Sequence, residues 1–136
     1  MKRLCGFILS FVWMIISIQA KETTLVIYST NDMHGSINNF AKIAKFIENE
    51  RKKYPHTLLL NGGDIFSGNP VVDQYPQRGK PMIELMNAVG YQYATFGNHE
   101  FDFGQQALKQ CMNHADYEWI CANMEVNHSS AVNKMP

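Results

Sequence analysis

The sequence predicts an α/β fold with a parallel-type sheet flanked by helices, and three observations lead to this prediction. Four short apolar runs have the length and composition of buried strands. Stretches with helical periodicity alternate with these runs. A polar cluster follows each of the first three runs directly. Because right-handed crossovers return each strand in the same direction, we expect the order β-α-β-α-β-α-β in one mostly parallel sheet that is covered on both faces.

The first strand is expected at residues 24–30, where four consecutive apolar residues suit a strand that is buried on both faces. A loop follows at Asn31. Residues 39–53 then carry apolar side chains at the spacing of an amphipathic helix, namely Phe40, Ile43, Ala44 and Ile47. We expect Pro55 to stop this helix, whose last turn is basic and therefore complements the negative helix end.

The second strand is expected at residues 57–60, and the two glycines that follow it permit a tight turn into Asp64. Residues 66–79 are rich in Gly, Pro, Asn and Ser, so we expect a long loop that lines a site. Pro81 suits the first turn of the next helix, and Gly90 suits the position just past its end.

The remaining elements repeat this alternation. We expect a third strand at residues 91–96, a helix at residues 105–113 and a fourth strand at residues 119–122. The sequence contains no internal repeat and no second domain boundary. One domain is therefore predicted.

The N-terminus has the pattern of a secretory signal peptide. Two basic residues precede an apolar run from residue 4 to residue 18, and the small residue Ala20 follows. We expect residues 1–20 to be removed, so that residues 21–136 form a mature chain that is exported to the periplasm or the extracellular space. A retained membrane anchor is the alternative, although the run of about 15 apolar residues is shorter than the roughly 20 that a spanning helix needs.

The composition suits a compact globular domain, since 46% of the 136 residues are hydrophobic and 18% are charged. The formal net charge of +0 gives no basic footprint, so we exclude nucleic acid as a partner. In an oxidising compartment Cys111 and Cys121 either form one disulfide or remain two small buried side chains, and their spacing leaves both alternatives open.

The three polar clusters carry side chains that bind divalent cations, and loops after parallel strands open at the same edge of a sheet. Asp32 and His34 lie two residues apart on a segment expected to be extended, where both can point at one cation. Asp64 can use one carboxylate oxygen for each of two cations, and Asn98 offers a neutral carbonyl oxygen to the second. Taken singly, such clusters are usually turns, but three in register favour a metal site.

His99 and Asp102 add acid–base chemistry to this arrangement. His99 can approach a phosphate or a leaving group as an acid or hydrogen-bond donor, and Asp102 can fix its tautomer. Alternatively, Asp102 caps the helix that is expected to begin near Gly104. Because a pair of cations lowers the pKa of water and binds phosphate oxygens, the pattern predicts hydrolysis of phosphate esters.

These clusters resemble those of the calcineurin-like metallophosphoesterases, and Gly97-Asn98-His99-Glu100 is the most specific of them. Residues 91–104 look like the 5'-nucleotidase and UDP-sugar hydrolase branch. The resemblance implies that Asp32 and His34 bind one metal, Asp64 bridges and Asn98 binds the other. It further implies that His99 and Asp102 form a catalytic pair and that Asn98 and His99 contact the substrate.

The same resemblance implies two divalent metal ions, drawn from Zn, Mn, Co and Mg, and a small-molecule phosphate ester, such as a nucleotide, as substrate. Members of the family also use histidines from later strands, including a Gly-His-x-His motif that this sequence lacks. We therefore expect residues 21–136 to be the N-terminal part of a catalytic domain, with a separate C-terminal nucleotidase domain as a possible partner. The alternative is a non-catalytic fragment or binding module that retains a partial metal site.

Overall fold

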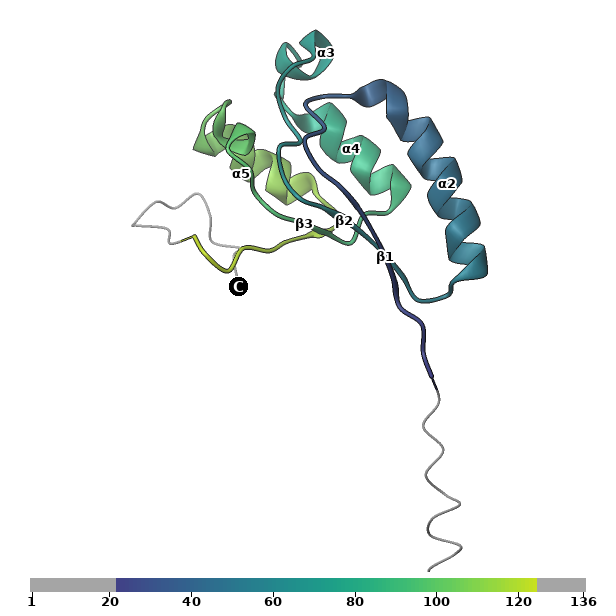
Figure 1. Ribbon diagram of the computed structural model, residues 1–136. Helices are drawn as coiled ribbons and strands as arrows, with labels where there is room; N and C mark the ends of the chain where they lie inside the picture. Colours follow the sequence, from purple (N-terminus) through teal and green to yellow (C-terminus); the bar gives the residue numbers. More distant parts are fainter. Residues whose placement is uncertain (1–21, 125–136) are drawn as a thin grey trace, which may run out of the picture.

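The computed structural model describes residues 22–124, which form a four-stranded parallel sheet with helices between the strands (Figure 1). The strands lie in the order β1-β2-β3-β4, and each neighbouring pair is parallel. This confirms the predicted α/β class and the predicted order of strands and helices. The elements are β1 (Val26–Thr30), η1 (Ile37–Asn39), α2 (Phe40–Lys53), β2 (Thr57–Asn61), α3 (Pro70–Asp73), α4 (Lys80–Val89), β3 (Tyr93–Ala94), η2 (His99–Phe101), α5 (Gln105–His114) and β4 (Glu118–Trp119).

Strands β3 and β4 are shorter than the sequence predicts, with two residues each. Single backbone hydrogen bonds extend the sheet past their ends, from Thr95 N to Asn61 O at 3.0 Å and from Ile120 N to Ala94 O at 2.8 Å. Beyond Thr95 the chain bends into the third polar cluster, which ends the pairing. The expected long loop at residues 66–79 contains one extra turn of helix, α3.

The helices lie side by side, with α4 between α2 and α5 (Figure 1). Each presents an apolar stripe to the core, and α4 buries Met82, Ile83 and Met86 completely. The predicted stop of α4 is confirmed, because Gly90 adopts a φ of +81° and its N–H donates to Met86 O at 3.0 Å. Arg51 of α2 donates to the carbonyls of the same helix end, which ties the two helices together.

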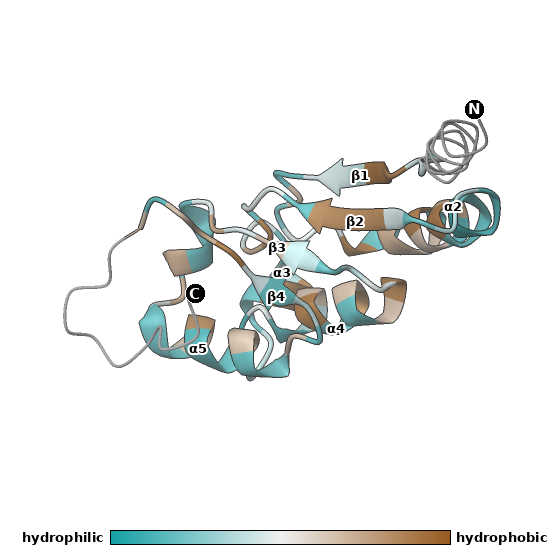
Figure 2. Cartoon of the chain, turned by 90° about the horizontal axis from the view of Figure 1, so that it is seen from below, coloured by the Kyte–Doolittle hydropathy of each residue, from teal (hydrophilic) through white to brown (hydrophobic). Residues whose placement is uncertain are grey.

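The two faces of the sheet differ in burial. In β2 the residues Thr57, Leu59 and Asn61 are buried, whereas Leu25 and Ile27, next to β2 on the opposite face, are 56% and 54% exposed. Figure 2 shows α4 and α5 together on one side of the strands. The expected cover on both faces is therefore not seen within residues 22–124. The apolar run at residues 25–28 indicated a strand with both faces buried. Within residues 22–124, however, helices cover only one face of the sheet.

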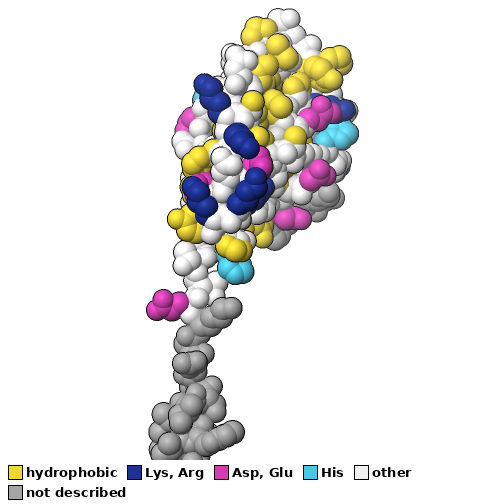
Figure 3. Space-filling view, turned by 90° about the vertical axis from the view of Figure 1, so that its right-hand side faces the viewer, with side chains coloured by type: hydrophobic (Ala, Val, Ile, Leu, Met, Phe, Trp, Pro, Cys, Tyr) yellow, Lys and Arg dark blue, Asp and Glu magenta, His cyan; other side chains and the backbone are white. Residues whose placement is uncertain are grey.

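The outer surface of α2 carries charges of both signs (Figure 3). Glu48 accepts from Lys45 Nζ at 3.0 Å and from Lys52 Nζ at 2.5 Å, and these hydrogen bonds lower the pKa of its carboxyl to about 2. Exposed pairs of this kind contribute little to stability.

Both described cysteines are free thiols. Cys111 is buried in the core, and its burial raises the pKa of the thiol to about 12. Cys121 is partly exposed and donates to Asn123 Oδ1 at 3.2 Å. The structure therefore contains no Cys111–Cys121 disulfide.

The predicted signal peptide at residues 1–20 lies outside the described residues. Between residues 22 and 124, no helix has the length and apolar character that a membrane span requires.

Candidate metal centre

The first two polar clusters extend the pairing of β1 and β2 beyond the ends of the strands. Gly62 N donates to Thr30 O at 2.7 Å, and three further backbone hydrogen bonds of 3.0–3.1 Å join the loops, from Asp32 N to Gly63 O, His34 N to Asp64 O and Gly35 N to Ile65 O. The two loops are thus held together by their backbones, as expected for loops at one edge of a parallel sheet.

The predicted ligands of these loops have unusual backbone conformations. Asp32, His34 and Asp64 have φ values of +51°, +44° and +55°, in the left-handed region. Such a conformation costs a residue with a side chain about 1–2 kcal/mol. Asp32 and His34 were expected on an extended segment, and this expectation is wrong, because both residues adopt the left-handed conformation while their N–H groups donate to the second loop. Backbone strain of this kind is typical of functional sites.

Asp32, His34 and Asp64 each offer one ligand atom, and these atoms lie within 4.8 Å of one another. His34 Nε2 is 3.9 Å from Asp32 Oδ1. Ligands at about 2.0–2.2 Å from one metal lie about 3–4 Å apart, so small rotations of these side chains would close the site on a cation. Carboxylate oxygens with one imidazole nitrogen suit several divalent metals. The donor set therefore fits a divalent cation, and the exposed Asp32 leaves the cluster open to solvent.

His99 brings the third polar cluster into contact with Asp64 and His34. Its backbone N–H donates to Asp64 Oδ1 at 3.0 Å. Its ring packs edge-on against the ring of His34, with the ring centroids 4.7 Å apart and the planes at 75°. Asn98 is exposed at the start of η2, and its side chain makes no hydrogen bond to the described residues. The structure thus brings Asp32, His34, Asp64 and His99 together.

His99 and Asp102 form a close pair, with His99 Nδ1 2.7 Å from Asp102 Oδ2. This hydrogen bond raises the pKa of His99 and lowers the pKa of Asp102. The alternative role of Asp102 as a helix cap is not observed, because Gly104 occupies the N-cap of α5 and no side chain caps that position. The geometry therefore supports the pairing of Asp102 with His99 and not the capping of α5 by Asp102.

Glu100 is a structural element of the site that the sequence analysis missed. Its side chain is 0% exposed, and its carboxylate accepts three backbone N–H groups, from Asp64 at 2.9 Å, Ile65 at 2.6 Å and Gly97 at 2.6 Å. One carboxylate therefore joins the second loop to the third. The bond from Gly97, three residues earlier, resembles a capping box, and this spacing was the available signal.

Two glycines allow these loops to approach each other. A Cβ atom at Gly97 would collide with the Asp64 carboxylate, and a Cβ atom at Gly63 would collide with the backbone of Gly97. Gly63 also has a φ of +98°, which disfavours any other residue. The close contact between Asp64 and the third loop therefore depends on glycine at both positions.

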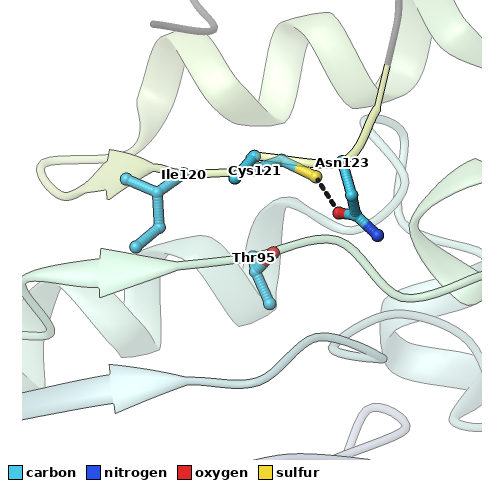
Figure 4. A pocket seen from close by; sticks show the side chains of 5 residues that line it. Thr95, Ile120, Cys121 and Asn123 are labelled. Atoms are coloured by element: carbon cyan, nitrogen blue, oxygen red, sulfur yellow. Dashed lines mark hydrogen bonds between the residues drawn. The ribbon is translucent and has the colours of Figure 1, made fainter.

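A pocket of about 410 Å³ lies at the same end of the neighbouring strands, beyond β3 and β4 (Figure 4). The residues that line it are Thr95, Ile120, Cys121, Ala122 and Asn123. None of the predicted ligands borders this pocket. It is thus separate from the cation cluster.

Fold and site together define a class of protein in which a parallel α/β sheet carries a carboxylate and imidazole cluster at the carboxyl ends of its strands. Comparison with known proteins gives the family: residues 25–133 match the calcineurin-like phosphoesterase family, and the chain belongs to it. This confirms the resemblance seen in the sequence.

Three relatives are named for nucleotide phosphoesterase or nucleotidase activities. The chain is 30% identical over 129 residues to the trifunctional nucleotide phosphoesterase protein YfkN of Bacillus subtilis, covering 78% of this chain and 9% of that protein. It is 29% identical to the snake venom 5'-nucleotidase of Gloydius brevicauda, covering 87% of this chain and 23% of that protein. The structure of the Haemophilus influenzae NAD nucleotidase NadN superposes with a TM-score of 0.72 at 27% identity, covering 82% of this chain and 23% of that one.

The chain is much shorter than these relatives. It spans between 9% and 23% of the length of the proteins just compared. The matched region includes all three polar clusters, which lie between residues 32 and 100.

Proposed function

We propose that this chain carries the metal-binding part of an exported phosphoesterase of the 5'-nucleotidase type, which hydrolyses nucleotides or related phosphate esters. The observation that carries the proposal is the cluster of Asp32, His34 and Asp64 with the His99–Asp102 pair beside it. Membership of the calcineurin-like phosphoesterase family supports the reaction class.

The proposed cofactor is a pair of divalent metal ions drawn from Zn, Mn, Co and Mg. Asp32 and His34 would hold one ion, Asp64 would contact both, and Asn98 would contribute its side-chain carbonyl oxygen to the second. Such ions supply Lewis acidity and lower the pKa of water toward neutrality. The backbone hydrogen bonds between the first two loops orient the ligands before any ion binds.

His99 is proposed to act on the phosphate or on the leaving group. Asp102 accepts from Nδ1, which leaves Nε2 as the nitrogen available to a substrate. The raised pKa of His99 increases the fraction of imidazolium, the form that can donate a proton to a leaving oxygen. Asp64 Oδ1 accepts a hydrogen bond from the backbone of His99, so the position of the proposed acid is fixed relative to the proposed metal ligands.

The substrate class is proposed from the relatives, which are named for nucleotide phosphoesterase, 5'-nucleotidase and NAD nucleotidase activities. Export is proposed from the leader-like residues 1–20, and a venom enzyme among the relatives agrees with it. A separate C-terminal nucleotidase domain is proposed as a partner, because the relatives extend far beyond the matched region.

The test is hydrolysis of a chromogenic phosphate monoester and of a nucleoside monophosphate by the purified chain with Mn, Zn, Co or Mg. We expect turnover that falls by at least about a hundredfold in His99→Asn, since general acid–base groups contribute 10²–10⁴-fold. Turnover should also be lost in Asp64→Asn, which removes the carboxylate that would contact both ions. Asp116→Asn is the matched control, because Asp116 is exposed and precedes β4 at the other edge of the sheet.

A second candidate function is a binding module with a partial metal site. It is favoured by the geometry of the cluster, in which Asp32, His34 and Asp64 supply three protein ligands for one cation. Cation binding without turnover with any of the four metals would support this candidate and contradict the first.

A further inference from the structure

The loop after the second polar cluster places a serine against the His99–Asp102 pair. Ser67 Oγ is 3.2 Å from His99 Nδ1, the nitrogen that also lies 2.7 Å from Asp102 Oδ2. The Ser67 hydroxyl also hydrogen-bonds the carboxylate and lowers the pKa of Asp102. Three side chains from two separate loops therefore form one network.

Ser67 shares the backbone conformation of the predicted metal ligands. Four described residues other than glycine have a positive φ, and Ser67, at +60°, is the one among them that is not a predicted ligand. A residue with a side chain keeps this disfavoured conformation only where its surroundings impose it.

The neighbours of Ser67 hold it in place from both sides. Phe66 is 1% exposed in the core, with its ring 6.1 Å from that of Phe103. Gly68 N donates to Asp73 Oδ2 at 3.1 Å, and a Cβ atom at Gly68 would lie 3.0 Å from His34 O. The backbone of Ser67 is thus held between the core and the first polar cluster.

We infer that Ser67 is a positioning residue, which donates its hydroxyl proton to Asp102 and thereby holds His99 as the Nδ1–H tautomer, with Nε2 directed toward substrate. The proton assignments follow from the donors present. Neutral His99 donates from Nδ1 to the carboxylate, and Ser67 donates to the same carboxylate, so Asp102 accepts twice. With its proton directed to Asp102, the Ser67 oxygen faces His99 Nδ1 at 3.2 Å as an acceptor, a contact that exists only in the Nδ1–H tautomer, so its loss favours the Nε2–H tautomer. This inference rests on the proposed role of His99.

The test measures the tautomer of His99 by ¹⁵N NMR of the full chain without metal, at a pH where the imidazole is neutral. The His99 signals are assigned from their loss in His99→Asn. We expect Ser67→Ala and Ser67→Gly to lower the ratio of the Nδ1–H to the Nε2–H tautomer by about tenfold, the size of effect that one lost hydrogen bond can produce. Ser29→Ala is the control, because Ser29 is exposed on β1 and far from this loop in sequence.

The two variants separate the hydroxyl from the backbone. Glycine adopts a positive φ without strain, so Ser67→Gly preserves the loop even if Ser67→Ala does not fold. A wild-type tautomer ratio in either folded variant overturns the inference, since the serine would then act through its backbone alone. The readout needs neither metal nor turnover. A chain that shows the tautomer shift but hydrolyses no phosphate ester would therefore contradict the proposed function and leave this inference standing.

Discussion

Replacement of Glu100 by glutamine is the sharpest perturbation of the site that leaves its shape intact. The buried carboxylate accepts from Asp64 N and Gly97 N through Oε2 and from Ile65 N through Oε1. In Glu100→Gln the amide oxygen can take the place of Oε2, where it keeps two acceptor contacts. The amide NH₂ group then faces Ile65 N–H, so two donors meet in a site with no exposure to solvent.

The expected cost follows from these contacts. A buried donor without a partner costs about 1–3 kcal/mol, and each of the two remaining bonds weakens by about 1 kcal/mol when the acceptor loses its charge. We therefore expect the free energy of unfolding to fall by about 3–5 kcal/mol. Affinity for a divalent cation should also fall, because Glu100 holds the backbone of Asp64.

Urea unfolding followed by circular dichroism measures the first effect, and calorimetric titration with Mn²⁺ measures the second. Glu84→Gln is the matched control, because Glu84 is exposed on α4 and its carboxylate lies 3.4 Å from Lys80 Nζ. The control should change stability by less than about 0.5 kcal/mol. A loss of less than about 1 kcal/mol in Glu100→Gln would refute the claim that this carboxylate joins the loops.

Two further predictions test the approach of the loops and the attachment of α2. Gly97→Ala should weaken Mn²⁺ binding by at least about tenfold in the same titration, because its Cβ would displace the Asp64 carboxylate. Gly104→Ala strains a backbone φ of +81° and should destabilise the fold, but its Cβ lies in open space, so Mn²⁺ affinity of the folded chain should stay unchanged. Equal affinity in both variants would contradict the steric account. Glu50→Gln should destabilise the protein at neutral pH, because the hydrogen bond from Lys53, followed by that from Tyr28, lowers the pKa of Glu50 below its usual 4.5. The stabilisation from a depressed carboxyl pKa is fully present above the unfolded value of 4.5 and is lost as the pH falls through the lower folded value. The difference in unfolding midpoint from the wild type should therefore shrink as the pH falls below 4.5, and a constant difference would exclude this cause.

The α/β class and the meeting of the polar clusters could be predicted from the sequence, because both follow from local patterns. The helical spacing of apolar residues at 39–53 predicted α2, and Gly90 predicted the end of α4. Once strands and helices alternate, the parallel order places the first two loops at one edge. The pairing of His99 with Asp102 was likewise accessible, since three residues separate them along one turn.

Other features depend on contacts between distant segments and carry no local signal. The left-handed backbone at Asp32 and His34 arises from hydrogen bonds to the second loop. The role of Ser67 requires a loop from one cluster to reach the side chains of another. The exposure of Leu25 and Ile27 depends on which elements cover the sheet, which an apolar run alone does not determine.

Anomalous diffraction from crystals grown with Mn²⁺ tests the central claim most directly, because it locates the cation itself. The account predicts an anomalous peak within about 2.0–2.6 Å of donor atoms of Asp32, His34 and Asp64, a peak that is lost in Asp64→Asn. A peak at another position, or no peak in crystals of the wild-type chain, would contradict it.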